Sequence, residues 1–197
     1  MDPVNILIAL NLIATIGANL TGAKRGFRSS TAASKERPKG FLQSVPPNLS
    51  ALVFVFIGLG IFRVGTADYD PGLLPARLAG LAIFAAFSWI QISAFKSLGQ
   101  FYSQDIVVLK NHMIVKKGLY GFIRHPQYLS QILSDAGAVL AVLSYPAAVL
   151  VLIEIPILIM RARAEDALFA KHFGHEFSEY RARTGFMFPK FRKTLKV

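Results

Sequence analysis

The chain has 197 residues, of which 53% are hydrophobic and 17% are charged, with a formal net charge of +11 and no cysteine. This composition is too apolar for a soluble domain of that size and is typical of a polytopic membrane protein with one domain. The lack of cysteine excludes disulfides, thiolate metal sites and cysteine nucleophiles, and a soluble nucleic-acid binder is excluded because the positive charges lie between apolar segments.

The N-terminal half contains three segments that are predicted to form membrane helices. Residues 3–23 carry no charge and are long enough to cross a hydrocarbon core of about 30 Å. Residues 40–62 are also uncharged, and Pro46-Pro47-Asn48 predicts a turn with an N-cap, so the second helix is expected to run from about Leu49 to Phe62. The third helix is expected over residues 78–95.

The last long apolar run is predicted to form a helical hairpin rather than one span. Ser144-Tyr145-Pro146 interrupts residues 136–153, and the polar ends extend the hairpin from Tyr128 to Met160. Pro156 should bend its second helix. We therefore expect an all-α, polytopic integral membrane protein with about five transmembrane helices and a C-terminal helical tail.

The charges between these segments predict an orientation. Residues 24–39 hold six Lys/Arg against one Glu, residues 96–125 hold five against one Asp, and the tail from Arg161 onward holds nine against four acidic residues. Residues 63–77 hold two charges of each sign. By the positive-inside rule, five spans give an outside N-terminus and a cytoplasmic C-terminus, in the inner membrane if the host is prokaryotic.

Two charged residues leave the last apolar segment on one helix face. Arg161 and Glu165 are four residues apart, so they either close a pocket together or form an exposed ion pair that contributes a few tenths of a kcal/mol. Glu154 lies about 10 Å before Arg161 along the helix, too far for the two side chains to pair directly. We therefore expect Glu154 to pair with another residue, to line a wet cavity or to stay protonated. Asp135, early in the hairpin, is costly there unless it is paired or near water.

A polar and aromatic cassette precedes the hairpin. Residues 118–128 read Gly-Leu-Tyr-Gly-Phe-Ile-Arg-His-Pro-Gln-Tyr, which offers more functional groups than a membrane anchor requires. In isolation these residues could simply be interfacial. After the hairpin, residues 161–166 read Arg-Ala-Arg-Ala-Glu-Asp and residues 173–180 read Phe-Gly-His-Glu-Phe-Ser-Glu-Tyr. In this combination and order, residues 98–189 resemble the isoprenylcysteine carboxyl methyltransferase family.

The resemblance implies an S-adenosylmethionine-dependent membrane methyltransferase with a cytoplasmic cofactor pocket and a tunnel that admits a lipophilic acceptor from the bilayer. It implies that Arg161 is catalytic and holds the acceptor carboxylate, and that Glu165 binds the cofactor ammonium. An ionised carboxylate needs positioning rather than a general base, and a guanidinium fork suits it. The other cofactor-binding positions that the resemblance implies are His112, Val115, Gly118, Tyr120, His125 and Tyr128.

The resemblance also sets the expected domain organisation and the alternatives. One membrane domain, residues 1–197, is expected to contain three N-terminal helices in 1–97 and a methyltransferase-like catalytic region in 98–189. Its partners would be the lipophilic acceptor and membrane lipids, and four scattered histidines predict no metal. The alternatives are a related phospholipid or small-molecule N- or S-methyltransferase, in which Arg161 would steady the cofactor or a phosphate, and a non-enzymatic membrane interaction protein with a lipid-binding basic tail.

Overall fold

The computed structural model describes residues 2–31, 34–36 and 40–190. Within this part of the chain the α-helices are α1 (Pro3–Thr31), α2 (Phe41–Ile61), α3 (Leu74–Leu98), α4 (Pro126–Val142), α5 (Tyr145–Phe173) and α6 (His175–Arg183). Two short strands, β1 (Ser34–Glu36) and β2 (Val108–Leu109), pair antiparallel, with Ser34 opposite Leu109 and Glu36 opposite Val108. Single 3-10 turns are η1 (Pro71–Leu73), η2 (Gly99–Phe101) and η3 (Gly118–Gly121).

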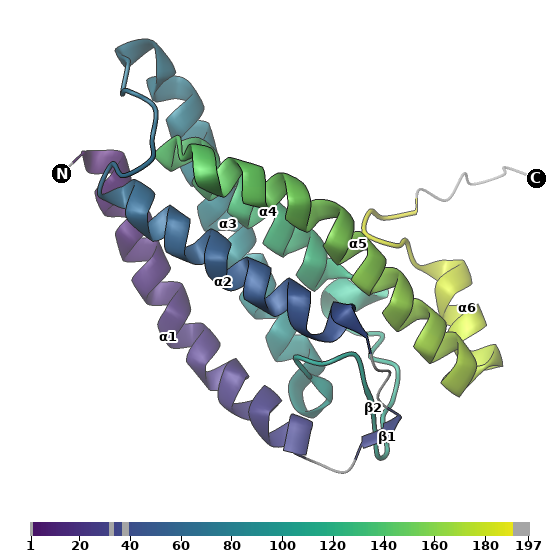
Figure 1. The fold of residues 1–197 in the computed structure, drawn as a ribbon. Helices are drawn as coiled ribbons and strands as arrows, with labels where there is room; N and C mark the ends of the chain where they lie inside the picture. The colour runs from purple at the N-terminus through teal and green to yellow at the C-terminus, as the bar shows by residue number, and fades with distance from the viewer. Residues whose placement is uncertain (1, 32–33, 37–39, 191–197) are drawn as a thin grey trace, which may run out of the picture.

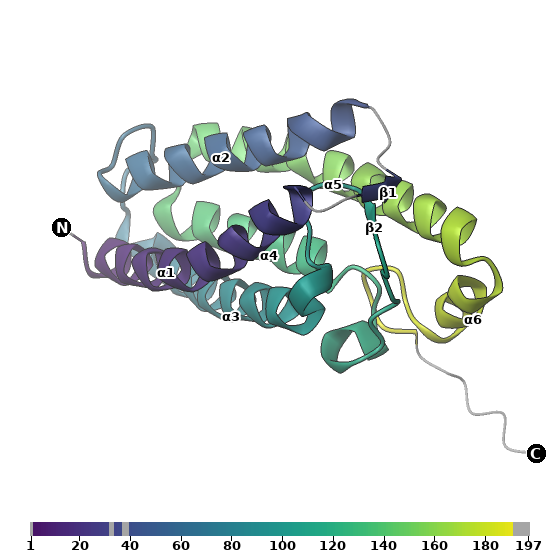
Figure 2. The ribbon, with the colours of Figure 1, turned by 90° about the horizontal axis from the view of Figure 1, so that it is seen from below.

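Helices α1 to α5 form an elongated bundle whose connections alternate between its two ends (Figure 1). The N-terminus, the α2–α3 connection and the α4–α5 connection lie at one end, whereas β1, β2 and α6 lie at the other. Helix α4 is central because it contacts each of the other four (Figure 2). The end that carries α6 therefore gathers the segments in which the sequence predicts a cofactor site.

The α3–α4 crossing depends on two glycines. A Cβ atom on Gly80 would lie 2.7 Å from the carbonyl oxygen of Gly137, and one on Gly137 would lie 2.6 Å from the backbone nitrogen of Phe84. No real side chain tolerates such distances, so both positions require glycine. Small residues allow two membrane helices to approach closely, and here they fix α4, the helix that begins at the cassette.

The surface of the bundle is rich in apolar side chains. Leu10 in α1 is 58% exposed and Leu152 in α5 is 70% exposed, although both are large and aliphatic. By length and composition, two segments of the described chain, Phe41–Ile61 and Pro71–Phe101, can cross a membrane, and Pro3–Ala18 is a shorter apolar helix. The predicted all-α class is confirmed for the described residues, whereas the count of five membrane spans stays a prediction.

The predicted start of the second helix is wrong. Helix α2 begins at Phe41, eight residues before Leu49, and Pro46 and Pro47 lie inside it rather than in a turn before it. Proline removes the backbone N–H that would bond to the carbonyl four residues earlier, so Pro46 frees the carbonyl of Leu42. The guanidinium of Arg161 donates to this oxygen at 2.6 Å, which replaces the missing helix bond.

The other helices lie where the sequence predicts them, although several are longer, and α5 extends to Phe173, beyond the predicted end at Met160. Helix α1 runs eight residues beyond the predicted end at Ala23, and α3 exceeds the predicted 78–95 at both ends. The predicted break between the last two helices is confirmed, because α4 ends at Val142 and α5 begins at Tyr145. The Ser144 hydroxyl accepts a bond from the backbone nitrogen of Ala147 at 3.4 Å and so caps α5.

Candidate active site

The cassette is held in place by the segment that follows α6. Pro126 occupies the first turn of α4, a position that lacks a helix partner for its nitrogen in any case, and His125 is the residue before it. The backbone nitrogens of Arg124 and His125 donate to the carbonyls of Gly185 and Phe186 at 2.9 and 3.1 Å. These backbone hydrogen bonds resemble those between paired strands. They bring the segment that follows α6 next to the start of α4, although the two are far apart in the sequence.

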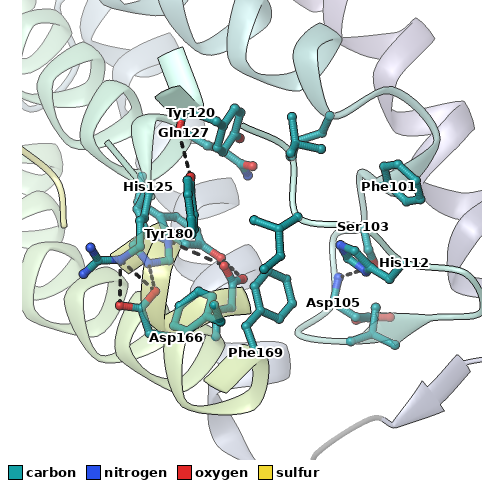
Figure 3. Close-up of a pocket in the computed structure, with 18 residues that line it drawn as sticks. Phe101, Ser103, Asp105, His112, Tyr120, His125, Gln127, Asp166, Phe169 and Tyr180 are labelled. Carbon is teal, nitrogen blue, oxygen red and sulfur yellow. Dashed lines mark hydrogen bonds and ion pairs between the residues drawn. The ribbon is translucent and has the colours of Figure 1, made fainter. Parts of the chain in front are cut away.

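A cavity opens between the cassette, the loop before it and the C-terminal half of α5 (Figure 3). Its lining combines carboxylates, aromatic rings and small apolar side chains. The residues that line it are Leu98, Phe101, Ser103, Asp105, Val107, His112, Ile114, Val115, Tyr120, Arg124, His125, Gln127, Tyr128, Glu165, Asp166, Phe169, Phe177 and Tyr180. We refer to it as the first cavity.

Arg124, His125 and Asp166 form a network at one wall of the first cavity, where Figure 3 shows His125 and Asp166 side by side. His125 Nε2 lies 2.9 Å from Asp166 Oδ1, and Arg124 Nε donates to Asp166 Oδ2 at 3.1 Å. Burial raises the pKa of Asp166, but the hydrogen bond and charge of His125, together with Arg124, outweigh burial and leave that pKa below its ordinary value of 3.8. Asp166 thus orients both cassette side chains as an ionised carboxylate.

Replacing Asp166 by asparagine is expected to lower thermal stability in a pH-dependent way. Since the folded-state pKa lies below 3.8, the stabilisation is fully present above that pH and is lost as the pH falls through the folded-state value. Removing charged hydrogen bonds costs about 2–3 kcal/mol at neutral pH. Melting of detergent-solubilised protein should show a lower midpoint for Asp166→Asn at pH 7 and a shrinking difference at more acidic pH. A constant difference across the pH range would exclude this role.

The opposite wall of the first cavity is aromatic. The His112 ring stacks on Phe101 with centroids 5.2 Å apart and meets the edge of Phe169 at 5.1 Å. Burial, followed by the charge of His172, lowers the pKa of His112 to about 4. The ring is therefore neutral at pH 7, and its Nδ1 accepts a hydrogen bond from the backbone nitrogen of Leu109 at 3.4 Å. A neutral imidazole among aromatic rings is a surface suited to a planar heterocycle.

Tyr128 joins the two charged residues of α5. Its hydroxyl donates a short hydrogen bond to Glu165 Oε1 and accepts one from Arg161 Nε at 2.9 Å. Arg161 Nε lies 4.0 Å from Glu165 Oε1, and the Arg161 side chain is only 5% exposed. The pair differs from an exposed ion pair at a helix end, since Arg161 is buried, Glu165 is partly buried and a phenol bridges them.

Arg161 lies at a junction of three chain segments. Besides Tyr128 in α4, its guanidinium donates to the carbonyl of Leu42 in α2 and to the carbonyl of Gln104 in the loop after α3. A guanidinium has five N–H donors, and three are used in these bonds. These three bonds with the described residues leave two of its N–H groups available to a ligand.

Arg161 faces a second cavity that adjoins the first. This second cavity has a volume of about 290 Å³ and lies between α2, α3, α4 and α5, and the two cavities share Ser103, Gln127 and Tyr128 as lining residues. Glu165 lines the first cavity and Arg161 lines the second. The phenol of Tyr128 thus stands between a carboxylate on one side and a guanidinium on the other.

The structure brings most of the predicted site residues together. His112, Val115, Tyr120, His125, Tyr128 and Glu165 all line the first cavity. Gly118 does not line it; with a φ of 58° it begins the turn η3, and a Cβ there would lie 3.4 Å from the hydroxyl of Ser97. Arg161 lies at the second cavity. Arg161 and Glu165 line different cavities, although their side chains lie 4.0 Å apart and both bond to the Tyr128 hydroxyl.

Sequence reasoning missed several residues of this site. The sequence assigns no role to Asp166, although it anchors both Arg124 and His125. Phe169 follows Glu165 by four residues, so helical spacing could have identified it as a neighbour in the same wall. Phe101 and Asp105 lie in an irregular loop where no periodicity applies. In residues 2–31, 34–36 and 40–190, no group of three or more His, Cys, Asp or Glu could hold a metal ion.

A family model of known proteins matches part of the chain. The family model described as the isoprenylcysteine carboxyl methyltransferase (ICMT) family matches residues 78–171. The matched range contains most of α3, all of α4 and nearly all of α5, and so includes the cassette, Arg161 and Glu165. No curated protein matches the chain.

Proposed function

Because the chain belongs to the isoprenylcysteine carboxyl methyltransferase family, whose members are membrane methyltransferases, we propose that it transfers a methyl group from S-adenosylmethionine to the carboxylate of an isoprenylcysteine-type or other lipophilic acceptor. The observation that carries this proposal is the pair of adjoining cavities. One offers a carboxylate, the other offers a guanidinium, and Tyr128 lies between them. A site with two cavities of opposite charge suits a reaction between two substrates of opposite charge.

The residues of the first cavity fit the proposed cofactor by their chemistry. S-adenosylmethionine carries an ammonium group, a planar adenine and a positively charged sulfur. Glu165, whose side chain is 23% exposed, is a carboxylate for the ammonium. The neutral His112 ring with Phe101 and Phe169 suits adenine, and Tyr120 and Tyr128 supply aromatic faces that favour a cation. His125 and Val115 complete the wall.

When bound, the cofactor supplies an electrophilic methyl group. The chain's own contribution is positioning, because an ionised carboxylate acceptor has no proton to lose. Arg161 would hold that carboxylate with the two N–H groups that remain after its bonds to Leu42, Gln104 and Tyr128. Since these protein bonds fix the guanidinium plane, little side-chain entropy is lost when the acceptor binds.

The proposed enzyme lies in the membrane with the α6 end in the cytoplasm. This end carries Lys116, Arg124 and, in α6, Arg181 and Arg183, which fits the positive-inside rule. The N-terminus then lies outside, in the inner membrane if the host is prokaryotic. We propose that a lipophilic acceptor reaches the second cavity, which residues of α2, α3, α4 and α5 line, laterally from the bilayer.

One observation favours a second candidate function. Three of the five N–H groups of Arg161 already bond to the protein, which suits a residue that steadies the site for a phospholipid or small-molecule N- or S-methyltransferase. In that case the acceptor would be an amine or a thiol. Parallel assays with prenylcysteine analogues, phospholipids and thiols distinguish the two candidates.

The proposed cofactor is tested by calorimetric titration of detergent-solubilised protein with S-adenosylhomocysteine. We expect micromolar binding by the wild type and a loss of about 30-fold in Glu165→Ala, since a truncated charge-assisted bond costs about 2 kcal/mol. His125→Ala should also weaken binding, because it removes a ring from the wall of the first cavity.

Glu179→Ala is the matched control, since Glu179 is an exposed carboxylate on α6 that pairs with His175 outside the first cavity. Its affinity should equal that of the wild type. If folded wild-type protein binds no S-adenosylhomocysteine, both methyltransferase proposals fail, and a non-enzymatic membrane interaction protein becomes the better account.

A further inference from the structure

The second cavity is polar although it lies among membrane helices. Its apolar lining is limited, and most of its walls carry amide, hydroxyl or charged groups, each of which is costly in a bilayer unless it contacts water or a polar ligand. A tunnel for a plain hydrocarbon chain would not need them. The polar residues that line it are Ser50, Gln91, Tyr102, Ser103, Gln104, Gln127, Tyr128, Gln131, Asp135 and Arg161.

Helices α4 and α5 each supply a carboxyl group at or near this cavity. Asp135 of α4 lines the cavity, and Glu154 of α5, which is fully buried and does not line it, is close enough to act electrostatically on Asp135. Glu154 Oε1 accepts from Ser50 Oγ at 2.6 Å and from Gln131 Nε2 at 2.7 Å. Glu154 Oε2 has no hydrogen-bond partner among the described residues.

This carboxyl pair has no cationic partner among the described residues. In the part of the chain that the structure describes, neither Asp135 nor Glu154 forms an ion pair with Lys, Arg or His. Two neighbouring carboxyls in a low-dielectric site cannot both be ionised unless a positive charge lies beside them. Ser50 and Gln131 bond to only one oxygen of Glu154. If Glu154 served only to link α2, α4 and α5, neither its unbonded Oε2 nor the cavity-facing Asp135 would have a purpose.

We propose that Asp135, backed by Glu154, binds an ammonium group of the acceptor, so that the acceptor is an amphipathic molecule with a cation as well as a methyl-accepting carboxylate. The inference rests on the proposed function only in taking the second cavity as the acceptor site. Arg161 holds the anionic end of this ligand and the carboxyl pair holds the cationic end. The chain thereby selects against prenyl acceptors that lack a positive charge.

Helices α4 and α5 predict the same distance between the carboxylate and the ammonium of the acceptor. Asp135 follows Tyr128 by seven residues in α4, and Glu154 precedes Arg161 by seven residues in α5. Seven residues rise about 10 Å along a helix. The ammonium of the acceptor should therefore lie about two helical turns from the carboxylate that Arg161 holds.

The test is the binding of ω-aminooctanoate, which carries both charges at this separation when extended, to detergent-solubilised protein without any methyl donor. Nonanoate replaces its ammonium by a methyl group, and N-acetyl-ω-aminooctanoate replaces it by a neutral amide. Affinities are measured calorimetrically for wild type, Asp135→Asn and Asp68→Asn. Asp68 is an exposed carboxylate in the α2–α3 connection and serves as the control.

We expect Asp135→Asn to weaken ω-aminooctanoate binding about tenfold or more and to change nonanoate binding by less than about twofold, with no effect of Asp68→Asn. Comparing variants for each probe cancels its partition into detergent. Equal ω-aminooctanoate affinity in wild type and Asp135→Asn would overturn the proposal. If Asp135→Asn does not fold, the affinities of the wild type for ω-aminooctanoate and for its N-acetyl form are compared instead. Failure to prefer the ammonium form would then overturn the proposal.

These outcomes are separate from the fate of the proposed methyl transfer. No methyl donor is present, so Asp135-dependent binding of the ammonium probe stands even if S-adenosylhomocysteine does not bind. Conversely, S-adenosylhomocysteine binding with no discrimination between the probes keeps the methyltransferase and rejects the cationic acceptor.

Discussion

Replacing Arg161 by lysine is expected to lower kcat/KM for methyl transfer to a prenylcysteine analogue by about 10²–10³-fold, the cost of losing one preorganised charge-stabilising donor group. Lysine keeps the positive charge but cannot form a fork. The guanidinium bonds at once to Leu42, Gln104 and Tyr128, and an ammonium cannot reach all three while also holding an acceptor. Turnover is measured with a methyl-labelled donor in mixed micelles.

The control for this variant is Arg163→Lys, two residues along α5, where the side chain is exposed. It should leave turnover unchanged. If Arg161→Lys lowers turnover but leaves S-adenosylhomocysteine affinity nearly unaltered, Arg161 acts on the acceptor. A parallel fall in both quantities would instead support the second candidate function, in which Arg161 steadies the cofactor.

Helix boundaries could be predicted where they depend on neighbouring residues in the sequence. The break at Ser144-Tyr145-Pro146 was predictable because a proline in the first turn and a serine cap are local signals. The start of α2 was not, because Pro46 and Pro47 normally end a helix. Here the carbonyl that Pro46 leaves free is satisfied by Arg161, 119 residues later in the chain. Tertiary contact overrode the local preference.

The site, like the fold, could be predicted only where the signal lies within one short segment. The cassette and the Arg161–Glu165 spacing were visible in the sequence, since each is a short motif on one element. The contact of Asp166 with both Arg124 and His125 was not, because it joins α5 to the start of α4 across the hairpin. Asp135 and Glu154 were recognised as costly, but their meeting depends on the register of α4 against α5, which no periodicity specifies.

Tyr128→Phe should separate the role of the phenol from that of the ring. The hydroxyl bonds to both Arg161 and Glu165, and its loss removes the oxygen that accepts from Arg161 Nε in a buried site. The ring itself stays, stacked near His125 with centroids 5.8 Å apart, so the fold should be kept. We expect kcat to fall about 10²-fold because both charged groups lose the contact that orients them.

S-adenosylhomocysteine affinity should fall less, by about tenfold, because Glu165 keeps its charge and loses only one neutral donor. Tyr145→Phe, at the opposite end of the bundle where the ring is 64% exposed, is the control and should behave as wild type. A kcat unchanged in Tyr128→Phe would show that Arg161 and Glu165 act independently. A larger fall in kcat than in affinity would show that the phenol aligns the contents of the two cavities, since only alignment is needed after both ligands are bound.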